Sequence, residues 1–199
     1  ILSGLVGSEM CIRDSIHAAP ADPERYQTIY GRRPASAAAP TAGLHFTPEL
    51  LARVRATCPV VDVELVVGVD TFRPVAVDDL DAHVMHTEAY AVEPASRRAI
   101  ADAIADGRRI VAIGTTSARV LETIADPAAP AAGRTGILIQ PGHAFRAVGG
   151  LVTNFHLPRS TLLALVMAFG GESRIRSAYA HAVERGYRFY SFGDAMAIL

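Results

Sequence analysis

The stretch IVAIGTTSARVLE, residues 110–122, decides the class of fold. Residues 110–113 are apolar and mostly β-branched, which predicts a short buried strand. Gly114 then marks a turn, and residues 116–125 have the composition and apolar spacing of a helix. A strand that leads through a tight turn into a helix is the repeating unit of an α/β protein.

The same alternation continues on both sides of this stretch. Thr47 precedes Pro48 and is expected to cap a helix. Further strands are predicted over residues 60–67, 137–139, 151–153 and 187–192, and further helices over 97–106, 160–169 and 173–185. The Ala/Pro/Gly stretch over 126–133 is expected to be a surface loop. We therefore expect an α/β fold with a largely parallel sheet and helices on both faces, in three layers.

Composition limits the classes of protein that fit. The chain has 199 residues and a net charge of −1, so an RNA-binding face would need a local cluster of Arg. Its two cysteines form no CxxC pair, which argues against a disulfide framework and a Cys-based metal site. The longest dense apolar run, residues 162–169, is too short to span a bilayer. These features predict a cytoplasmic protein without a membrane segment.

The first fifteen residues, ILSGLVGSEMCIRDS, do not fit a targeting signal. They have no basic start, and Glu9, Arg13 and Asp14 interrupt any apolar core of a signal peptide. The string resembles translated sequencing-adaptor sequence. We expect residues 1–15 to be a non-native leader and residues 16–199 to be the protein proper, with an ordinary short helix or tail as the alternative.

Five groups of polar residues are candidates for a functional site, and the first is the loop PTAGLHFT over residues 40–47. The loop leads directly into a helix start, where free N–H groups favour an anion such as a carboxylate or phosphate. His45 can transfer protons near neutral pH, and Thr41 and Gly43 are candidate binding residues. A structural helix cap with a satisfied histidine remains the alternative.

The second group is HVMHTE, residues 83–88. His83 and His86 would share a helical face, whereas His86 and Glu88 would share a strand face. A metal site would need a third ligand and a definite geometry. A hydrogen-bonded or acid–base role for His86 is therefore favoured, and no metal ligand is assigned.

The third group is the turn GTTSAR, residues 114–119. Hydroxyl groups at a helix N-terminus suit a ligand's carboxylate or ribose hydroxyls. Thr115, Thr116, Ser117 and Arg119 are the candidate binding residues. The turn has neither the phosphate-loop nor the dinucleotide-binding spacing of glycines, so an ordinary β–α connection remains open.

The fourth group, TNFHLPRST over residues 153–161, follows a predicted strand. Ligand sites in open α/β sheets lie at the carboxyl ends of strands. Candidate residues here are Asn154, His156, Arg159 and Ser160. Burying an amide and an imidazole is unfavourable unless both are hydrogen-bonded, which either a ligand or an internal polar network would provide.

The fifth group is YRFYSFGD, residues 187–194. Aromatic side chains interleaved with Arg can stack on a base, and Asp194 can accept hydrogen bonds. The alternative for at least half of these rings is an aromatic core strand.

Taken in order, the strings AAPTAGLHFT, TFRPV, HVMHTE, GTTSARVLE, QPGHAF, TNFHLPRSTLL and YRFYSFGDAM resemble the S-adenosylmethionine:tRNA ribosyltransferase-isomerase family of queuosine biosynthesis. The resemblance covers residues 26–198. It implies transfer of the ribosyl group of S-adenosylmethionine to 7-aminomethyl-7-deazaguanine in tRNA, and isomerisation that yields epoxyqueuosine, adenine and methionine. It also implies tRNA as partner, S-adenosylmethionine as co-substrate, no metal and a monomer.

The resemblance suggests roles for individual residues through their positions in the motifs, and these roles are hypotheses. His45 or His156 transfers the proton, with His86 as the third candidate. The donor's polar groups are assigned to Thr115, Thr116, Ser117 and Arg119. The base and ribose are assigned to Asn154, Arg159 and Asp194.

The chain also departs from the family pattern. Val66 follows Leu65 where the family usually has a histidine, and Gly149 stands where an aspartate is common. The family's N-terminal segment and inserted β-barrel domain have no counterpart, so the α/β domain is expected to be incomplete. One alternative is therefore an inactive relative that binds tRNA or a nucleoside. Another is a metal-dependent hydrolase built on His83, His86 and Glu88.

Overall fold

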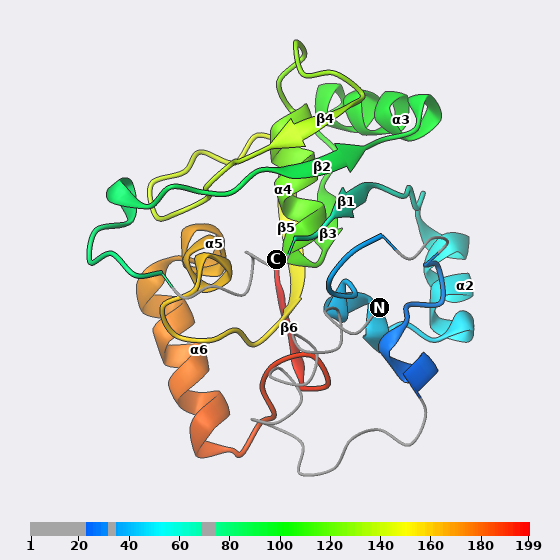
Figure 1. Cartoon of the computed structure of the whole chain (residues 1–199). Coiled ribbons are helices and arrows are strands. Elements are labelled where there is room, and N and C mark those ends of the chain that lie inside the picture. The colour runs from blue at the N-terminus through cyan, green and yellow to red at the C-terminus, as the bar shows by residue number, and fades with distance from the viewer. Residues whose placement is uncertain (1–22, 32–34, 69–74) are drawn as a thin grey trace.

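The computed structural model describes residues 23–31, 35–68 and 75–199, and these form two small sheets with helices around them (Figure 1). One sheet has the order β1-β2-β4 and is antiparallel throughout. The other has the order β3-β5-β6, with β3 and β5 parallel and β6 antiparallel to β5. The strands are β1 (Glu64–Val66), β2 (Glu88–Ala91), β3 (Ile110–Ile113), β4 (Ala132–Thr135), β5 (Val148–Asn154) and β6 (Ala195–Ile198).

Local signals set the ends of the helices. The Oγ1 of Thr47 accepts a hydrogen bond from the N–H of Leu50, as predicted for a cap, and the Oγ of Ser160 caps α5 in the same way. Gly171, with a φ of 83°, separates α5 from α6. The α-helices are α2 (Pro48–Thr57), α3 (Pro94–Ala105), α4 (Thr115–Ile124), α5 (Thr161–Gly170) and α6 (Glu172–Glu184). The short 3-10 helices are η1 (Pro23–Tyr26), η2 (Thr41–His45) and η4 (Leu80–Ala82).

Helix α4 is the central element of the fold. It contacts β1 and β4 of one sheet and β3 and β5 of the other, and Figure 1 shows it between them. Val120 and Leu121 on this helix belong to the hydrophobic core, together with Leu151 of β5 and Leu165 of α5. Because both sheets cover α4, its polar residues are also carried into the interior.

The α/β class is confirmed, but a single largely parallel, three-layer sheet is not. Three of the four strand pairings among the described residues are antiparallel. Alternation of strands and helices in a sequence indicates the type of each element but not the direction in which a strand joins its sheet. Here α4 lies between two sheets instead of covering one face of a single sheet.

Several predicted elements differ from those observed. The predicted strands over 137–139 and 187–192 are wrong, while β4 begins inside the predicted 126–133 loop and β6 follows the aromatic stretch. Cross-strand partners stabilise β4, which pairs along β2 despite its Gly and Arg. Tyr190, with a φ of 67°, breaks the extended conformation that the aromatic alternation had predicted.

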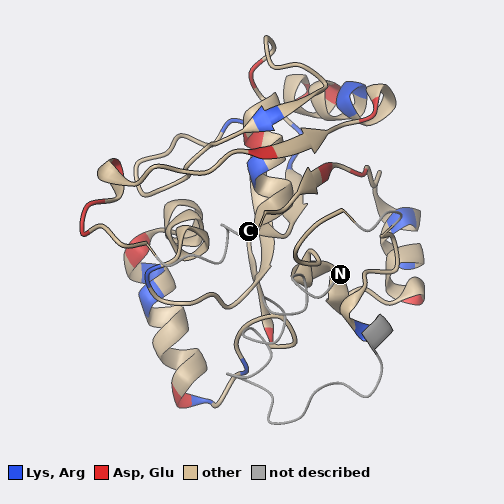
Figure 2. Ribbon diagram, in the orientation of Figure 1, with Lys and Arg blue, Asp and Glu red and all other residues tan. Residues whose placement is uncertain are grey.

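Charged residues are frequent on the helices α2, α3 and α6, whereas β3, β5 and β6 carry none (Figure 2). Glu122 on α4 is an exception, since it is 1% exposed. Its carboxylate accepts the backbone N–H groups of Arg146, Ala147 and Val148 at 2.9–3.0 Å, and His143 Nε2 lies 3.2 Å away. Glu122 thereby joins α4 to the start of β5. Within the described ranges, no helix has the length and apolar character needed to cross a membrane.

Candidate functional site

Three of the predicted site stretches meet around one cavity of about 130 Å³, which is room for several water molecules or part of a small ligand. They are the loop that leads into η2, the turn between β3 and α4, and the end of β5. Because β3 and β5 are parallel, their carboxyl ends lie at the same edge of the sheet. The predicted site residues in the lining are Thr41, Thr115, Thr116, Arg119, Asn154, His156 and Ser160.

The N-terminus of α4 forms one wall of the cavity. Gly114 has a φ of 89°, a conformation that favours glycine, and it turns the chain from β3 into the helix. No side chain caps this end, so its first N–H groups have no capping acceptor. Thr115 and Thr116 line the cavity, whereas Ser117 does not, because its Oγ donates to the carbonyl of Ile113 at 2.8 Å. This wall has the polarity that an anionic ligand requires.

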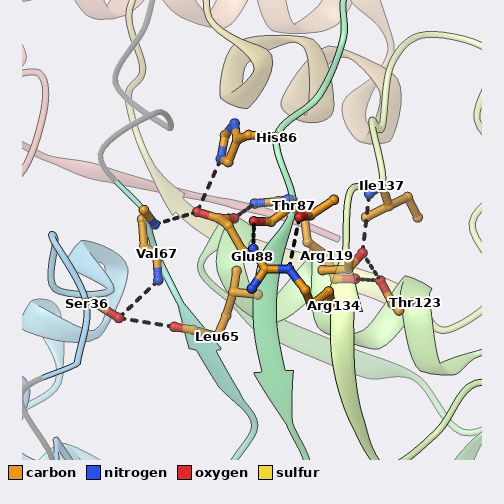
Figure 3. A network of polar contacts seen from close by, with 12 residues as sticks. Ser36, Leu65, Val67, His86, Thr87, Glu88, Arg119, Thr123, Arg134 and Ile137 are labelled. Atoms are coloured by element: carbon orange, nitrogen blue, oxygen red, sulfur yellow. Dashed lines mark hydrogen bonds and ion pairs between the residues drawn. The ribbon is translucent and has the colours of Figure 1, made fainter.

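An ion pair lies behind this wall (Figure 3). Arg119 of α4 is 3% exposed, and its Nη1 donates to Oε2 of Glu88 on β2. The other carboxylate oxygen, Oε1, accepts the N–H of Gly68 at 2.9 Å and lies 3.3 Å from Nε2 of His86. Nε and Nη2 of Arg119 are buried and have no hydrogen-bond partner among the described residues. Glu88 and Arg119 thus connect His86 to the cavity.

Asn154, at the end of β5, connects the cavity to two loops. Its Nδ2 donates to the carbonyl of Tyr190 at 3.0 Å and lies 3.2 Å from Nε2 of His45. These partners define which end of the amide is the nitrogen, and the buried Oδ1 has no partner among the described residues. His45 therefore lies beside the lining, on its exposed side, and the cavity presents a free acceptor next to it.

His156 is held in a largely apolar environment. Its Nε2 lies 2.8 Å from Oγ1 of Thr153, and its backbone N–H donates to Oη of Tyr179 at 2.9 Å. Burial lowers the pKa of His156 from 6.5 to about 4, so the imidazole is neutral at pH 7. Burial also raises the pKa of Tyr179 to about 12, which keeps its hydroxyl protonated. A neutral His156 can accept a proton from a group in the cavity. It cannot act as an imidazolium acid at pH 7.

The remaining predicted residues do not line the cavity. Gly43 is packed against Tyr30, whose ring occupies the space that a Cβ would need. Arg159 is exposed and pairs with Asp78 at 3.4 Å, and Asp194 accepts the N–H of Arg188 at 2.8 Å. Their proposed roles stay predictions.

Some lining residues were not singled out from the sequence. Tyr26 contributes to the cavity, as do Phe155 of the fourth candidate group and Tyr190 and Ser191 of the fifth, none of which was named as an individual site residue. The aromatic stretches that contain Tyr26 and Tyr190 were the available signal. Glu88 was considered together with His83 and His86, and no local pattern indicated that it pairs with a residue 31 positions away.

The proposed metal cluster has a different arrangement. The carboxylate of Glu88 contacts Arg119, the N–H of Gly68 and His86. It therefore serves to hold the guanidinium of Arg119 in place. Within residues 23–31, 35–68 and 75–199, no group of three or more His, Cys, Asp or Glu side chains has the arrangement of a metal site. The geometry therefore does not favour the metal-dependent hydrolase.

The described residues define an α/β protein with a cavity at the carboxyl ends of two parallel strands, where polar groups are set in a largely apolar lining. Comparison with known proteins gives the family: the chain belongs to the queuosine biosynthesis proteins, whose family profile matches residues 6–198. This agrees with the resemblance carried by the seven sequence motifs.

Individual relatives support the same assignment. An S-adenosylmethionine:tRNA ribosyltransferase-isomerase from Anaeromyxobacter dehalogenans is 59% identical over 185 residues, which are 89% of this chain and 52% of the relative. A relative of the same name from Moorella thermoacetica is 54% identical over 195 residues, which are 96% of this chain and 57% of the relative. The chain thus spans about half the length of these relatives.

A solved structure has the same fold. The crystal structure of S-adenosylmethionine tRNA ribosyltransferase from Thermotoga maritima superimposes with a TM-score of 0.65 at 44% sequence identity. The match covers 79% of this chain and 51% of that protein.

Proposed function

We propose that this chain provides the donor-binding part of an enzyme that modifies tRNA in queuosine biosynthesis. The reaction moves the ribosyl group of S-adenosylmethionine to 7-aminomethyl-7-deazaguanine and isomerises it to an epoxycyclopentane, with release of adenine and methionine. The substrate itself supplies the leaving group, because the sulfonium departs as a neutral thioether. The protein must provide a base, orientation and stabilisation of developing charge.

The observation that carries this proposal is the convergence of three distant stretches on one cavity. The start of η2, the start of α4 and the end of β5 contribute Thr41, Thr115 and Asn154 to the same lining. The donor's polar groups would contact the Thr115–Thr116 wall and Arg119. Relatives named for this reaction, at 54–59% identity, supply the chemical class.

In this proposal, two histidines are the candidates for proton transfer. His156 lines the cavity and is neutral at pH 7, so it can act as a base, although its pKa of about 4 makes it a weak one. His45 is more exposed, and the contact with Asn154 orients its ring. His86 would act indirectly, through Glu88 and Arg119.

Further features of the proposal concern the protein as a whole. The reaction would need no metal, and the protein would act as a cytoplasmic monomer with tRNA as its macromolecular substrate. Residues 16–199 would form the C-terminal major part of the α/β domain. The inserted β-barrel domain would belong to the part of the relatives that this chain does not match.

The test is release of adenine from S-adenosylmethionine in the presence of tRNA that carries 7-aminomethyl-7-deazaguanine. We would assay this chain and a chimera in which it replaces the matching region of the Anaeromyxobacter dehalogenans relative, since the chimera supplies the rest of that protein. Adenine formed in proportion to epoxyqueuosine is the expected result. A folded chimera that binds S-adenosylmethionine and tRNA but forms no adenine would contradict the proposal and indicate an inactive binding relative.

Two sequence departures bear on that outcome. Gly149 lies near the start of β5, whereas the cavity is lined by the end of that strand. Val66 is half-buried on β1 and is likewise outside the lining. Neither Val66 nor Gly149 is itself part of the cavity lining, although Val66 directly precedes the lining residue Val67.

A further inference from the structure

One polar group in the cavity wall lacks the partners that burial requires. Arg119 is 3% exposed and lines the cavity, yet its Nε and Nη2 have no hydrogen-bond partner among the described residues. Leaving buried donors of a charged group unpaired is unfavourable by about 1–3 kcal/mol or more. Nε and Nη2 lie on the same edge of the planar guanidinium, and their parallel N–H groups match the two oxygens of a carboxylate.

The opposite side of the guanidinium is already occupied. Nη1 donates to Oε2 of Glu88, and Glu88 is 2% exposed and fixed in turn by the N–H of Gly68 at 2.9 Å. Figure 3 shows Glu88 between His86 and Arg119, with its carboxylate directed at both. This pairing fixes the plane of the guanidinium, so the free edge is oriented in advance and a ligand need not order it.

We infer that this free edge of Arg119 binds the carboxylate of the amino-acid part of the donor. The identity of the donor rests on the proposed function. A phosphodiester of tRNA does not fit, because it is flanked by ribose on both sides and cannot approach a guanidinium that is 3% exposed. A terminal carboxylate is smaller and can enter the cavity that Arg119 lines, where a small displacement of the covering side chains would bring it to Nε and Nη2. The uncapped N-terminus of α4 in the same wall adds a second preference for negative charge.

The cavity also offers a complement to the donor's hydrogen-bond donors. Oδ1 of Asn154 is buried without a partner, while Nδ2 of the same residue is engaged by Tyr190 and His45. A ligand with a carboxylate as well as ammonium or hydroxyl groups satisfies both unpaired sites, whereas a simple anion satisfies one.

The experiment compares two ligands that differ by the carboxylate alone. Isothermal titration calorimetry on this chain would measure the binding of S-adenosylmethionine and of its decarboxylated analogue. We expect the analogue to bind at least about tenfold more weakly. In Arg119→Met the two affinities should become equal, through loss of affinity for S-adenosylmethionine. Equal binding of both ligands to the unaltered chain, or binding of neither, would overturn the inference.

Two further variants control for loss of folding and for a general effect of removing an arginine. Arg119→Met leaves Glu88 as an unpaired buried charge, so Glu88→Gln with Arg119→Met provides a version without that charge. Arg134 on β4 is exposed and donates hydrogen bonds to Thr87, just before β2. Arg134→Met is therefore the matched control and should keep the full difference in affinity between the two ligands. Discrimination that persists in the folded double variant would also refute the inference. Discrimination without adenine release by the chimera would leave the inference intact and contradict the proposed reaction.

Discussion

Nδ2 of Asn154 lies 3.2 Å from Nε2 of His45, which joins the end of β5 to η2 across 109 positions of sequence. An amide nitrogen donates, so Nε2 of His45 is the acceptor in this contact when the imidazole carries its hydrogen on Nδ1. The contact thereby orients the ring of His45 at the edge of the cavity, as the proposed proton transfer would need.

The first prediction concerns the two histidines of the site. His45→Ala should reduce adenine release by the chimera by about 100-fold or more, because loss of a general acid or base has an effect of that size. His45 is exposed, so the unfolding free energy should change by less than about 0.5 kcal/mol. His181→Ala on the exposed face of α6 is the control. Near-normal turnover in both His45→Ala and His156→Ala would end the acid–base assignment.

The second prediction is a pH dependence of stability. His156 has a pKa of about 4 when folded and 6.5 ordinarily, so the unfolded chain binds a proton between these values that the folded chain does not. Stability contributed by the neutral ring is present above pH 6.5 and is lost as the pH falls toward 4, by up to about 3 kcal/mol. Urea unfolding at several pH values would measure it.

Variants identify the group responsible for that dependence. His156→Gln should show a shallower fall in unfolding free energy over the same pH range, whereas His181→Gln should retain the full fall. If the curves of the unaltered chain and His156→Gln run parallel, another group causes the effect.

The third prediction concerns the buried carboxylate of Glu122. Glu122→Gln should lower the unfolding free energy by about 2–4 kcal/mol, since an uncharged amide with one oxygen cannot accept all the N–H groups of residues 146–148. Chemical denaturation followed by circular dichroism would measure the loss. Glu184→Gln, at the exposed end of α6, is the matched control and should change stability by less than about 0.5 kcal/mol. Equal stability of the two variants would argue against this role.

The fourth prediction tests backbone strain at the cavity. Tyr190 has a φ of 67°, a left-handed conformation that is unfavourable for a residue with a Cβ by about 1–2 kcal/mol. Tyr190→Ala and Tyr190→Gly both remove the ring, so their difference isolates the backbone. The glycine variant should be the more stable by about 1 kcal/mol. The same pair at the exposed Tyr187 should show no such advantage for glycine, and a more stable alanine variant at position 190 would contradict the prediction.

Local signals were sufficient for much of the fold and for part of the site. The sequence predicted β3 at the observed residues, the start of α4 within one position, and the cap formed by Thr47. The meeting of the His45 loop, the Thr115 turn and the Asn154 strand end was also expected. Each of these depends on neighbours in the chain or on the rule that parallel strands end at a common edge.

Non-local pairings could not be predicted in the same way. The antiparallel pairing of β2 with β4 joins residues more than 40 positions apart, and β4 contains Gly133 and Arg134 where a strand pattern expects apolar residues. The contact between Glu88 and Arg119 likewise depends on how a sheet packs on a helix. No periodicity of one segment encodes such a partner, so the unpaired edge of Arg119 became visible only in three dimensions.

Helix α4 carries the wall of the cavity at one end and contacts both sheets along its length. Occupation of the cavity should therefore slow amide hydrogen exchange in β2 and in β5 together, although these strands belong to different sheets. A bound donor would therefore stabilise both sheets together. Without it, the domain would open more readily and would be more sensitive to proteases.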